Sequence, residues 1–253
     1  MNTLRKRLQS GDLLLGTMVT VPEPAICEAM ALTGFDWLFI DGEHGPIEPG
    51  DLPNLLAAAG STPCLVRTPG HDPGWMARAL DCGAAGIIAP MVNDADQATR
   101  IAQACRYPPE GQRGIGLGRA QGYGTRFQAT LESANDQVLV VVQAEHRQAV
   151  ENIESIARVP GIDCILIGPT DLAASYGKTG QADDPEIQRA MEHVCAVCHR
   201  QQIPCGIFGR DTEAVRPWQE RGCRLVVAGI DMAMLTERAG KLLNSLRHNR
   251  PSA

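Results

Sequence analysis

The sequence predicts a single α/β domain over residues 1–253, folded as a closed (β/α)8 TIM barrel. Two observations favour this fold: short, continuous apolar runs recur at fairly even intervals, and segments with helical spacing separate them. Continuous apolar strands that alternate with helices are typical of a parallel sheet covered on both faces. Eight such units in a chain of 253 residues fit one closed barrel.

The apolar runs are the expected strands. They cover residues 13–19, 36–40, 63–67, 86–92, 137–145, 164–169, 204–209 and 224–230. Helices are expected between them, for example over 73–83 and 94–108, where apolar residues recur every three or four positions. Residues 231–249 are amphipathic and form either the last helix of the barrel or a helix that binds a partner. The candidate apolar positions of this segment are Met234, Leu235, Leu242, Leu243 and Leu246.

An open, doubly wound sheet is the alternative fold. Such a sheet usually carries a G-x-G-x-x-G turn between a strand and a helix when it binds a dinucleotide. The glycine-rich segment 114–124 follows RYPPEGQR and not an apolar strand, so it is interpreted as a mobile loop. The barrel is therefore favoured over the open sheet.

Composition excludes several classes of function. The formal net charge of −6 and the pI near 5.5 give no basic surface of the kind that nucleic acid or an anionic membrane requires. No apolar stretch approaches the roughly 20 residues of a membrane span, and residues 1–12 lack an apolar signal segment. The nine cysteines predict free thiols in a reducing compartment. We therefore expect a cytoplasmic protein that acts on small molecules.

One cysteine pattern matches a known motif. Cys195, Cys198 and His199 spell the C-x-x-C-H of covalent haem attachment. They lie in PEIQRAMEHVCAVCHRQQ, whose apolar residues have helical spacing, so cysteines that pack in a core are the favoured interpretation. Haem attachment of this kind also belongs to an exported compartment, and the sequence carries no export signal.

Polar residues follow several predicted strands, at the end of a barrel where enzymes carry their catalytic groups. Asp41, Glu43 and His44 end the apolar run at 36–40. Five further residues end or follow other strands: Arg67, Gln143, Glu145, Thr170 and Asp171. Because the carboxyl ends of parallel strands meet at one rim, we expect these side chains to share one site.

Glu145 and Asp171 are candidate ligands for a divalent metal ion. Their carboxylate oxygens suit Mg²⁺ or Mn²⁺, and two protein ligands leave positions for water and substrate. Pairing of each carboxylate with an arginine is the alternative, and spacing alone does not separate the two. The sequence has no H-E-x-x-H and no Cys/His spacing typical of a zinc site, which disfavours softer metals.

His44 and Arg67 are candidates for proton transfer and for binding of charge. His44 could be a general base, with Asp41 or Asp81 orienting its ring, or a hydrogen-bonded core histidine. Arg67 could bind a carboxylate or enolate oxygen, or neutralise acidic metal ligands. No lysine lies at the end of a predicted strand, so imine chemistry is not expected.

Six motifs, in order over residues 12–247, resemble the HpcH/HpaI family of metal-dependent class II 2-oxo-acid aldolases. They are DWLFIDGEHGP, LVRTPG, LDCGAAGIIAPMV, RYPPEGQRGIG, VVVQAEHRQAVENI and GIDCILIGPTDLAASYG. The family includes 4-hydroxy-2-oxoheptanedioate and 2-dehydro-3-deoxyglucarate aldolases. The resemblance implies a homohexamer, a trimer of dimers, in which neighbouring barrels exchange their last helix.

The resemblance also implies the ligands of the site. Mg²⁺, Mn²⁺ or Co²⁺ would bind to Glu145 and Asp171. Gln143 and Thr170 would contact the substrate, as would Asp171 and Arg67.

The implied reaction is reversible aldol cleavage of a 4-hydroxy-2-oxo acid to an aldehyde and pyruvate, or a related 2-oxo acid, through a metal-stabilised enolate. In this scheme His44 is the base, Arg67 stabilises the enolate, and Asp81 raises the basicity of His44; Asp41 is a further catalytic candidate. A carbon–carbon lyase acting on a CoA thioester, similar to citrate or malyl-CoA lyase, is the alternative, and it would need a basic groove for the nucleotide. A binding barrel without catalytic activity would be expected to lack the rim ligands.

Overall fold

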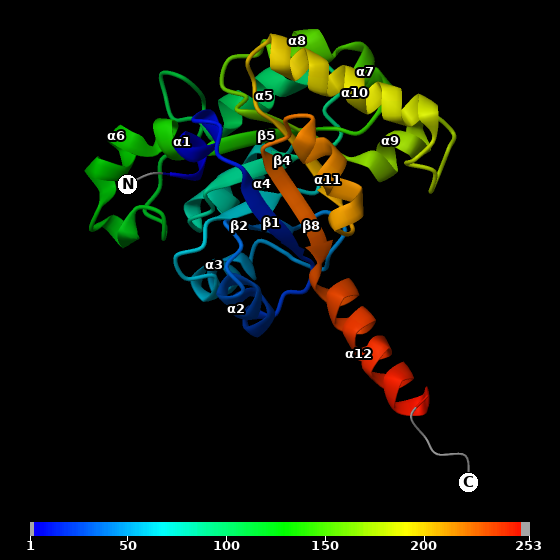
Figure 1. Ribbon diagram of the computed structural model, residues 1–253. Helices are drawn as coiled ribbons and strands as arrows, with labels where there is room; N and C mark the ends of the chain where they lie inside the picture. The colour runs from blue at the N-terminus through cyan, green and yellow to red at the C-terminus, as the bar shows by residue number, and fades with distance from the viewer. Residues whose placement is uncertain (1–2, 249–253) are drawn as a thin grey trace.

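The computed structural model describes residues 3–248, and this part of the chain forms a closed barrel of eight parallel strands (Figure 1). The strands follow one another in chain order, and the last pairs with the first. They are β1 (Leu14–Val19), β2 (Trp37–Asp41), β3 (Cys64–Arg67), β4 (Gly86–Ala89), β5 (Leu139–Ala144), β6 (Cys164–Ile167), β7 (Cys205–Gly209) and β8 (Leu225–Ile230). The predicted (β/α)8 fold is confirmed.

Helices cover the outside of the barrel and α1 (Leu4–Gln9) lies at its N-terminal end. The others are α2 (Pro24–Leu32), α3 (Leu52–Ala58), α4 (Pro73–Asp81), α5 (Ala95–Cys105), α6 (Phe127–Gln137), α7 (Arg147–Glu151), α8 (Ile153–Ala157), α9 (Pro169–Ser175), α10 (Pro185–Arg200), α11 (Thr212–Glu220) and α12 (Asp231–His248), with a 3-10 turn η1 at Gly122–Gly124. The C-x-x-C-H run lies inside α10, as predicted. Residue 249, the end of the predicted last helix, lies outside the described residues.

Several expected elements are shorter than their sequence patterns, and two of them end clearly early. The strand expected over 86–92 ends at Ala89, since Met91 has a left-handed backbone with φ of 52°. The helix expected over 94–108 ends at Cys105, because Arg106 is extended and two prolines follow Tyr107. The first loop carries Met91, which contacts Glu145 at the C-terminal rim. The second carries Arg106, which contacts Asp163 at the N-terminal end of the barrel.

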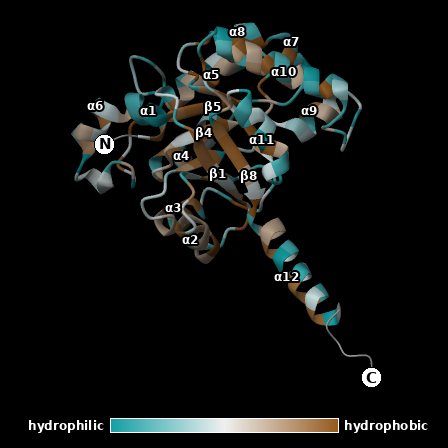
Figure 2. Cartoon of the chain, viewed as in Figure 1, coloured by the Kyte–Doolittle hydropathy of each residue, from teal (hydrophilic) through white to brown (hydrophobic). Residues whose placement is uncertain are grey.

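Apolar side chains fill the barrel and the layer between strands and helices, and Figure 2 shows the strands as the hydrophobic centre of the molecule. The interior packs Trp37, Phe39, Leu65 and Leu166 among other side chains, and Leu4 and Leu8 of α1 belong to the same cluster. Gly16 in β1 faces Trp37 so closely that a Cβ atom there would overlap the indole ring.

A buried ion network closes the N-terminal end of the barrel. Asp163, just before β6, accepts hydrogen bonds from Arg5 Nε at 2.7 Å and from an Arg106 terminal nitrogen at 2.8 Å. Asp163 Oδ2 also accepts a hydrogen bond from the Val140 backbone N–H at 2.9 Å. One carboxylate thus joins α1, the segment after α5, and β5.

The glycine-rich segment 114–124 is a loop, as expected, and it is anchored by specific hydrogen bonds. The Gln121 side chain accepts from the Gly118 N–H at 2.9 Å and donates to the Tyr107 hydroxyl at 2.8 Å. The Ala120 N–H donates to the backbone oxygen of Asp81. The loop therefore lies against the end of α4.

The last helix, α12, extends away from the barrel (Figure 1). Met234 packs beside Gly229, whereas Leu235, Leu242, Leu243 and Leu246 are exposed. Within residues 3–248 no helix is long and apolar enough to cross a bilayer.

Candidate active site

The predicted polar residues meet at the C-terminal rim of the barrel, around a cavity of about 280 Å³. Its wall includes Asp41, His44, Arg67, Gln143, Glu145, Thr170 and Asp171. Apolar side chains form the rest of the lining, chiefly Met18, Phe39, Leu166, Phe208 and Ile230. The strand-end argument named eight polar residues for one site; seven of them line this cavity, and the eighth, Glu43, contacts Arg67.

Asp41 and Arg67 form a buried, bidentate ion pair at the base of this cavity. They are the last residues of β2 and β3, and the strand register sets them side by side. Arg67 Nε donates to Asp41 Oδ1 at 2.8 Å, and a terminal nitrogen of Arg67 donates to Oδ2 at 2.7 Å. Burial alone would raise the pKa of Asp41, but the hydrogen bonds and charge of Arg67 outweigh it and hold that pKa below its usual value.

Asp41 also shapes the turn that carries the next residues. Its Oδ1 accepts the backbone N–H groups of Glu43 at 3.0 Å and His44 at 3.3 Å. Asp41 therefore contacts the backbone of His44 and not its ring. Asp41 thus holds both the Arg67 guanidinium and the backbone of this turn in place.

His44 lies at the open side of the cavity, with 63% of its side chain exposed. It is not a core histidine, which was the alternative interpretation. Its Nε2 lies 3.8 Å from Glu43 Oε2, and the same carboxylate oxygen is 3.2 Å from an Arg67 terminal nitrogen. Burial raises the pKa of Glu43. The sequence predicted Glu43 at this rim but no chemical role for it.

Glu145 is buried at the end of β5, and each of its carboxylate oxygens accepts a hydrogen bond. Oε1 accepts from the Met91 backbone N–H at 2.7 Å, and Oε2 accepts from Gln143 Nε2 at 2.7 Å. Burial, helped by the charges of Glu43 and Asp171, raises the pKa of Glu145 to about 7 against the opposing effects of the Met91 hydrogen bond and of Arg67. The left-handed backbone of Met91 points its N–H at this carboxylate, a contact that no sequence motif signalled.

The residues around Glu145 fit a hard divalent cation. Asp171 lies in the first turn of α9 and lines the same cavity. Gln143 Oε1 is buried without a hydrogen-bond partner, which leaves one more oxygen available beside the two carboxylates. A Cβ atom at Gly168 would lie 2.5 Å from Glu145 Oε2, so glycine keeps this space open.

The alternative of arginine-paired carboxylates does not describe this site. Arg67 forms ion pairs with Asp41 and Glu43. Across residues 3–248, no lysine or arginine forms an ion pair with Glu145 or Asp171, and Arg67 pairs with other carboxylates. The two carboxylates thus face the cavity without a cationic side chain of their own.

Asp81 lies apart from this site. It is the last residue of α4, which runs from the end of β3 back to the start of β4, and so it lies near the opposite end of the barrel. Its Oδ1 accepts a hydrogen bond from an Arg113 terminal nitrogen at 2.7 Å. Within one chain Asp81 therefore does not contact His44, and the pairing implied by the resemblance is not present there. The ends of the strands share one rim of the barrel, whereas a helix that leads into a strand ends at the opposite face.

Comparisons with known proteins agree with this architecture. The model of the HpcH/HpaI aldolase/citrate lyase family matches residues 15–237. A 4-hydroxy-2-oxovalerate aldolase of Novosphingobium aromaticivorans is 39% identical over 97% of this chain and 95% of its own length. A hydroxypyruvate/pyruvate aldolase of Paraburkholderia phytofirmans is 34% identical over 97% of this chain and 98% of its own.

A solved structure extends the likeness to the whole fold. The crystal structure of a HpcH/HpaI aldolase/citrate lyase family protein from Burkholderia cenocepacia J2315 superposes with a TM-score of 0.94 at 35% identity. The match covers 98% of this chain and 100% of the other.

Proposed function

The chain belongs to the HpcH/HpaI aldolase/citrate lyase family, and we propose that it catalyses reversible aldol cleavage of 4-hydroxy-2-oxo acids to pyruvate, or a related 2-oxo acid, and an aldehyde. One observation carries the proposal: a single small cavity contains two carboxylates without cationic partners, a buried arginine and an exposed histidine. The aldolase names of relatives that cover nearly the whole chain support the same reaction.

Glu145 and Asp171 would hold a divalent cation such as Mg²⁺, Mn²⁺ or Co²⁺, with Gln143 beside them. When bound, such a cation supplies Lewis-acid polarisation of the 2-oxo group of the substrate. Gln143 Nε2 holds Glu145 Oε2, and the Met91 N–H holds Oε1, so the carboxylate is oriented before the cation arrives.

Arg67 stabilises negative charge that develops on the substrate. Asp41 fixes one edge of the guanidinium. The remaining N–H groups of Arg67 can donate to a carboxylate or enolate oxygen in the cavity. Thr170 adds a hydroxyl to the wall, beside Asp171. The substrate therefore meets its donors in fixed positions.

His44 transfers protons at the open side of the cavity. It accepts the proton of the 4-hydroxyl during cleavage and returns a proton to pyruvate enolate, directly or through water. Glu43, 3.8 Å from the ring, is the carboxylate positioned to interact with the charged imidazole.

An assembly of several copies is part of the proposal. The exposed leucines of α12 support its exchange with a neighbouring barrel in a homohexamer, a trimer of dimers. Asp81 could raise the basicity of His44 only if it came from another copy. Its proposed role therefore depends on the assembly.

Nine free cysteines support the expectation of a cytoplasmic, reducing environment.

Pyruvate release tests the proposed reaction. The protein is stripped with chelator and supplied with a racemic 4-hydroxy-2-oxo acid, then with Mg²⁺, Mn²⁺ or Co²⁺ separately. We expect metal-restored release in the wild type and in Glu151→Gln, which changes an exposed carboxylate, but not in Glu145→Gln. Absence of release with every cation would contradict the proposal. Cleavage of a CoA thioester, supplied in a separate assay, would support the alternative lyase, and no turnover of either substrate would support a binding barrel.

A further inference from the structure

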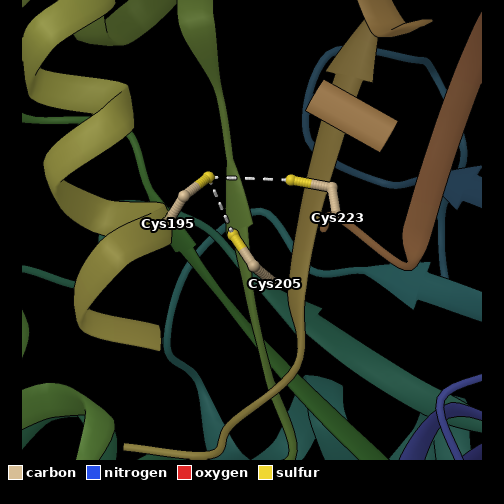
Figure 3. Close-up of side chains that lie close together, drawn as sticks. All are labelled: Cys195, Cys205 and Cys223. Atoms are coloured by element: carbon tan, nitrogen blue, oxygen red, sulfur yellow. Dashed lines mark hydrogen bonds between the residues drawn. The ribbon is translucent and has the colours of Figure 1, made fainter. Parts of the chain in front are cut away.

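Three cysteines from distant parts of the sequence meet at the wall of the barrel (Figure 3). Cys195 lies on α10, Cys205 opens β7, and Cys223 lies just before β8. Since Cys205 and Cys223 lie where their strands begin, the cluster is at the N-terminal end of the barrel wall, away from the rim cavity. No part of the proposed aldol reaction uses it.

The sulfur atoms have the spacing of metal-bound thiolates. Cys195 Sγ lies 3.7 Å from Cys205 Sγ and 3.7 Å from Cys223 Sγ, and all three sulfurs lie within 4.8 Å of one another. Zn–S bonds of about 2.3 Å at tetrahedral angles place sulfurs about 3.8 Å apart. In the described part of the chain, this is the one group of three or more Cys, His, Asp or Glu side chains whose possible ligand atoms all lie within 4.8 Å of one another.

The surroundings allow a cation to enter and remain there. Cys205 and Cys223 are buried, whereas Cys195 is partly exposed and gives access from solvent. The thiolate form of a cysteine is the one that binds metal.

We propose that Cys195, Cys205 and Cys223 form a site for a thiophilic cation of the Zn²⁺ class, separate from the carboxylate site at the rim. Three thiolates supply three of the four positions of a tetrahedral centre, and the partly exposed side leaves the fourth to water. Binding releases the thiol protons of the three cysteines to solvent. The bound cation joins α10 to the starts of β7 and β8 and stabilises this part of the barrel wall.

Cadmium binding tests the site through a signal that carboxylates do not give. The full-length protein is kept reduced with a phosphine, supplied with excess Mg²⁺, and titrated with Cd²⁺ alone. We expect an ultraviolet thiolate-to-cadmium charge-transfer band that saturates near one Cd²⁺ per chain, and a rise in thermal unfolding temperature. Cys82→Ser, which removes a cysteine of similar exposure outside the cluster, and Glu145→Gln should retain both effects.

Cys195→Ser should bind Cd²⁺ more than about tenfold more weakly. Loss of a residue that only hydrogen-bonds to a metal ligand already lowers affinity by about 10–100-fold, and loss of a ligand should cost at least as much. Alkylation provides a second test in the wild type, in which no variant has to fold. Cd²⁺ should slow iodoacetamide modification of Cys195 and leave that of Cys82 unchanged. The proposal is overturned if the wild type shows no charge-transfer band, if Cys195→Ser binds Cd²⁺ as the wild type does, or if Cd²⁺ leaves alkylation of Cys195 unchanged.

Discussion

At the scale of single residues, Arg67 shows how the rim is organised before substrate binds. Its side chain is 7% exposed, and its guanidinium is held on one edge by Asp41 and lies near Glu43 on another. A charged group fixed in a water-poor cavity requires little reorganisation when negative charge develops next to it. Asp41 contributes by holding Arg67 and the turn before His44.

Replacement of Arg67 should separate catalysis from stability. Arg67→Ala should lower turnover by about 10²–10³, as loss of a donor to an oxyanion does. It should also destabilise the fold by roughly 3–5 kcal/mol, since Asp41 is left buried without its partner. Adding Asp41→Asn to Arg67→Ala should recover part of the stability and none of the turnover. Steady-state rates and urea unfolding measure the two effects, and Arg200→Ala, at an exposed ion pair, is the control.

The ion pair should also make stability depend on pH. The pKa of Asp41 is lowered in the folded protein, so the folded state favours the ionised carboxylate. Its contribution is present above the unfolded pKa of about 3.9 and is lost as the pH falls through the lower folded value. The difference in free energy of unfolding between wild type and Asp41→Asn should therefore be constant between pH 5 and 7 and shrink below about pH 4. A difference that grew on acidification would contradict this account.

At the scale of elements, apolar runs predicted the strands because each is buried on both faces and bounded by turn residues. The same logic predicted the rim site, since parallel strands end together. This logic did not concern Asp81, whose role beside His44 is implied by the resemblance; within one chain Asp81 lies at the other end of the barrel, because a helix that returns to the start of the next strand carries its last residue there. The same logic missed Met91 and the cysteine cluster, because both depend on how loops and distant elements pack, which local spacing does not encode.

Gly16 provides a test of packing inside the barrel. Gly16→Ala places a methyl group on the Trp37 ring, and overpacking of this kind typically costs about 1–3 kcal/mol. Gly70→Ala is the matched control, because a Cβ atom at Gly70 has no neighbour within 4 Å. Urea unfolding of the two variants should show a loss of stability for the first only. Equal stability of both would mean that β1 and β2 can separate without cost.

At the scale of the whole molecule, α12 is the element that a single barrel leaves unexplained. It extends from the barrel (Figures 1 and 2), and its Leu242, Leu243 and Leu246 are exposed. Exposed apolar side chains in a row are typical of an interface. The proposed exchange between copies would bury them.

A charge on this surface should weaken the assembly. Leu242→Asp combined with Leu246→Asp should lower the mass measured by analytical ultracentrifugation, since burial of two aspartates is unfavourable. Ser245→Asp, at an exposed position of the same helix, controls for added charge. If the double variant kept the mass of the wild type, α12 would not form the interface.

The central claim is that Glu145 and Asp171 bind the cation that allows a 2-oxo acid to form its enolate beside Arg67. Exchange of the methyl protons of pyruvate with deuterium oxide, followed by NMR in the absence of aldehyde, tests it most directly. We expect chelator-treated wild type to show little exchange, added Mg²⁺ or Mn²⁺ to restore it, and Glu145→Gln to remain slow while Glu151→Gln behaves as the wild type. Exchange that is equally fast without metal, or in Glu145→Gln, would contradict the account.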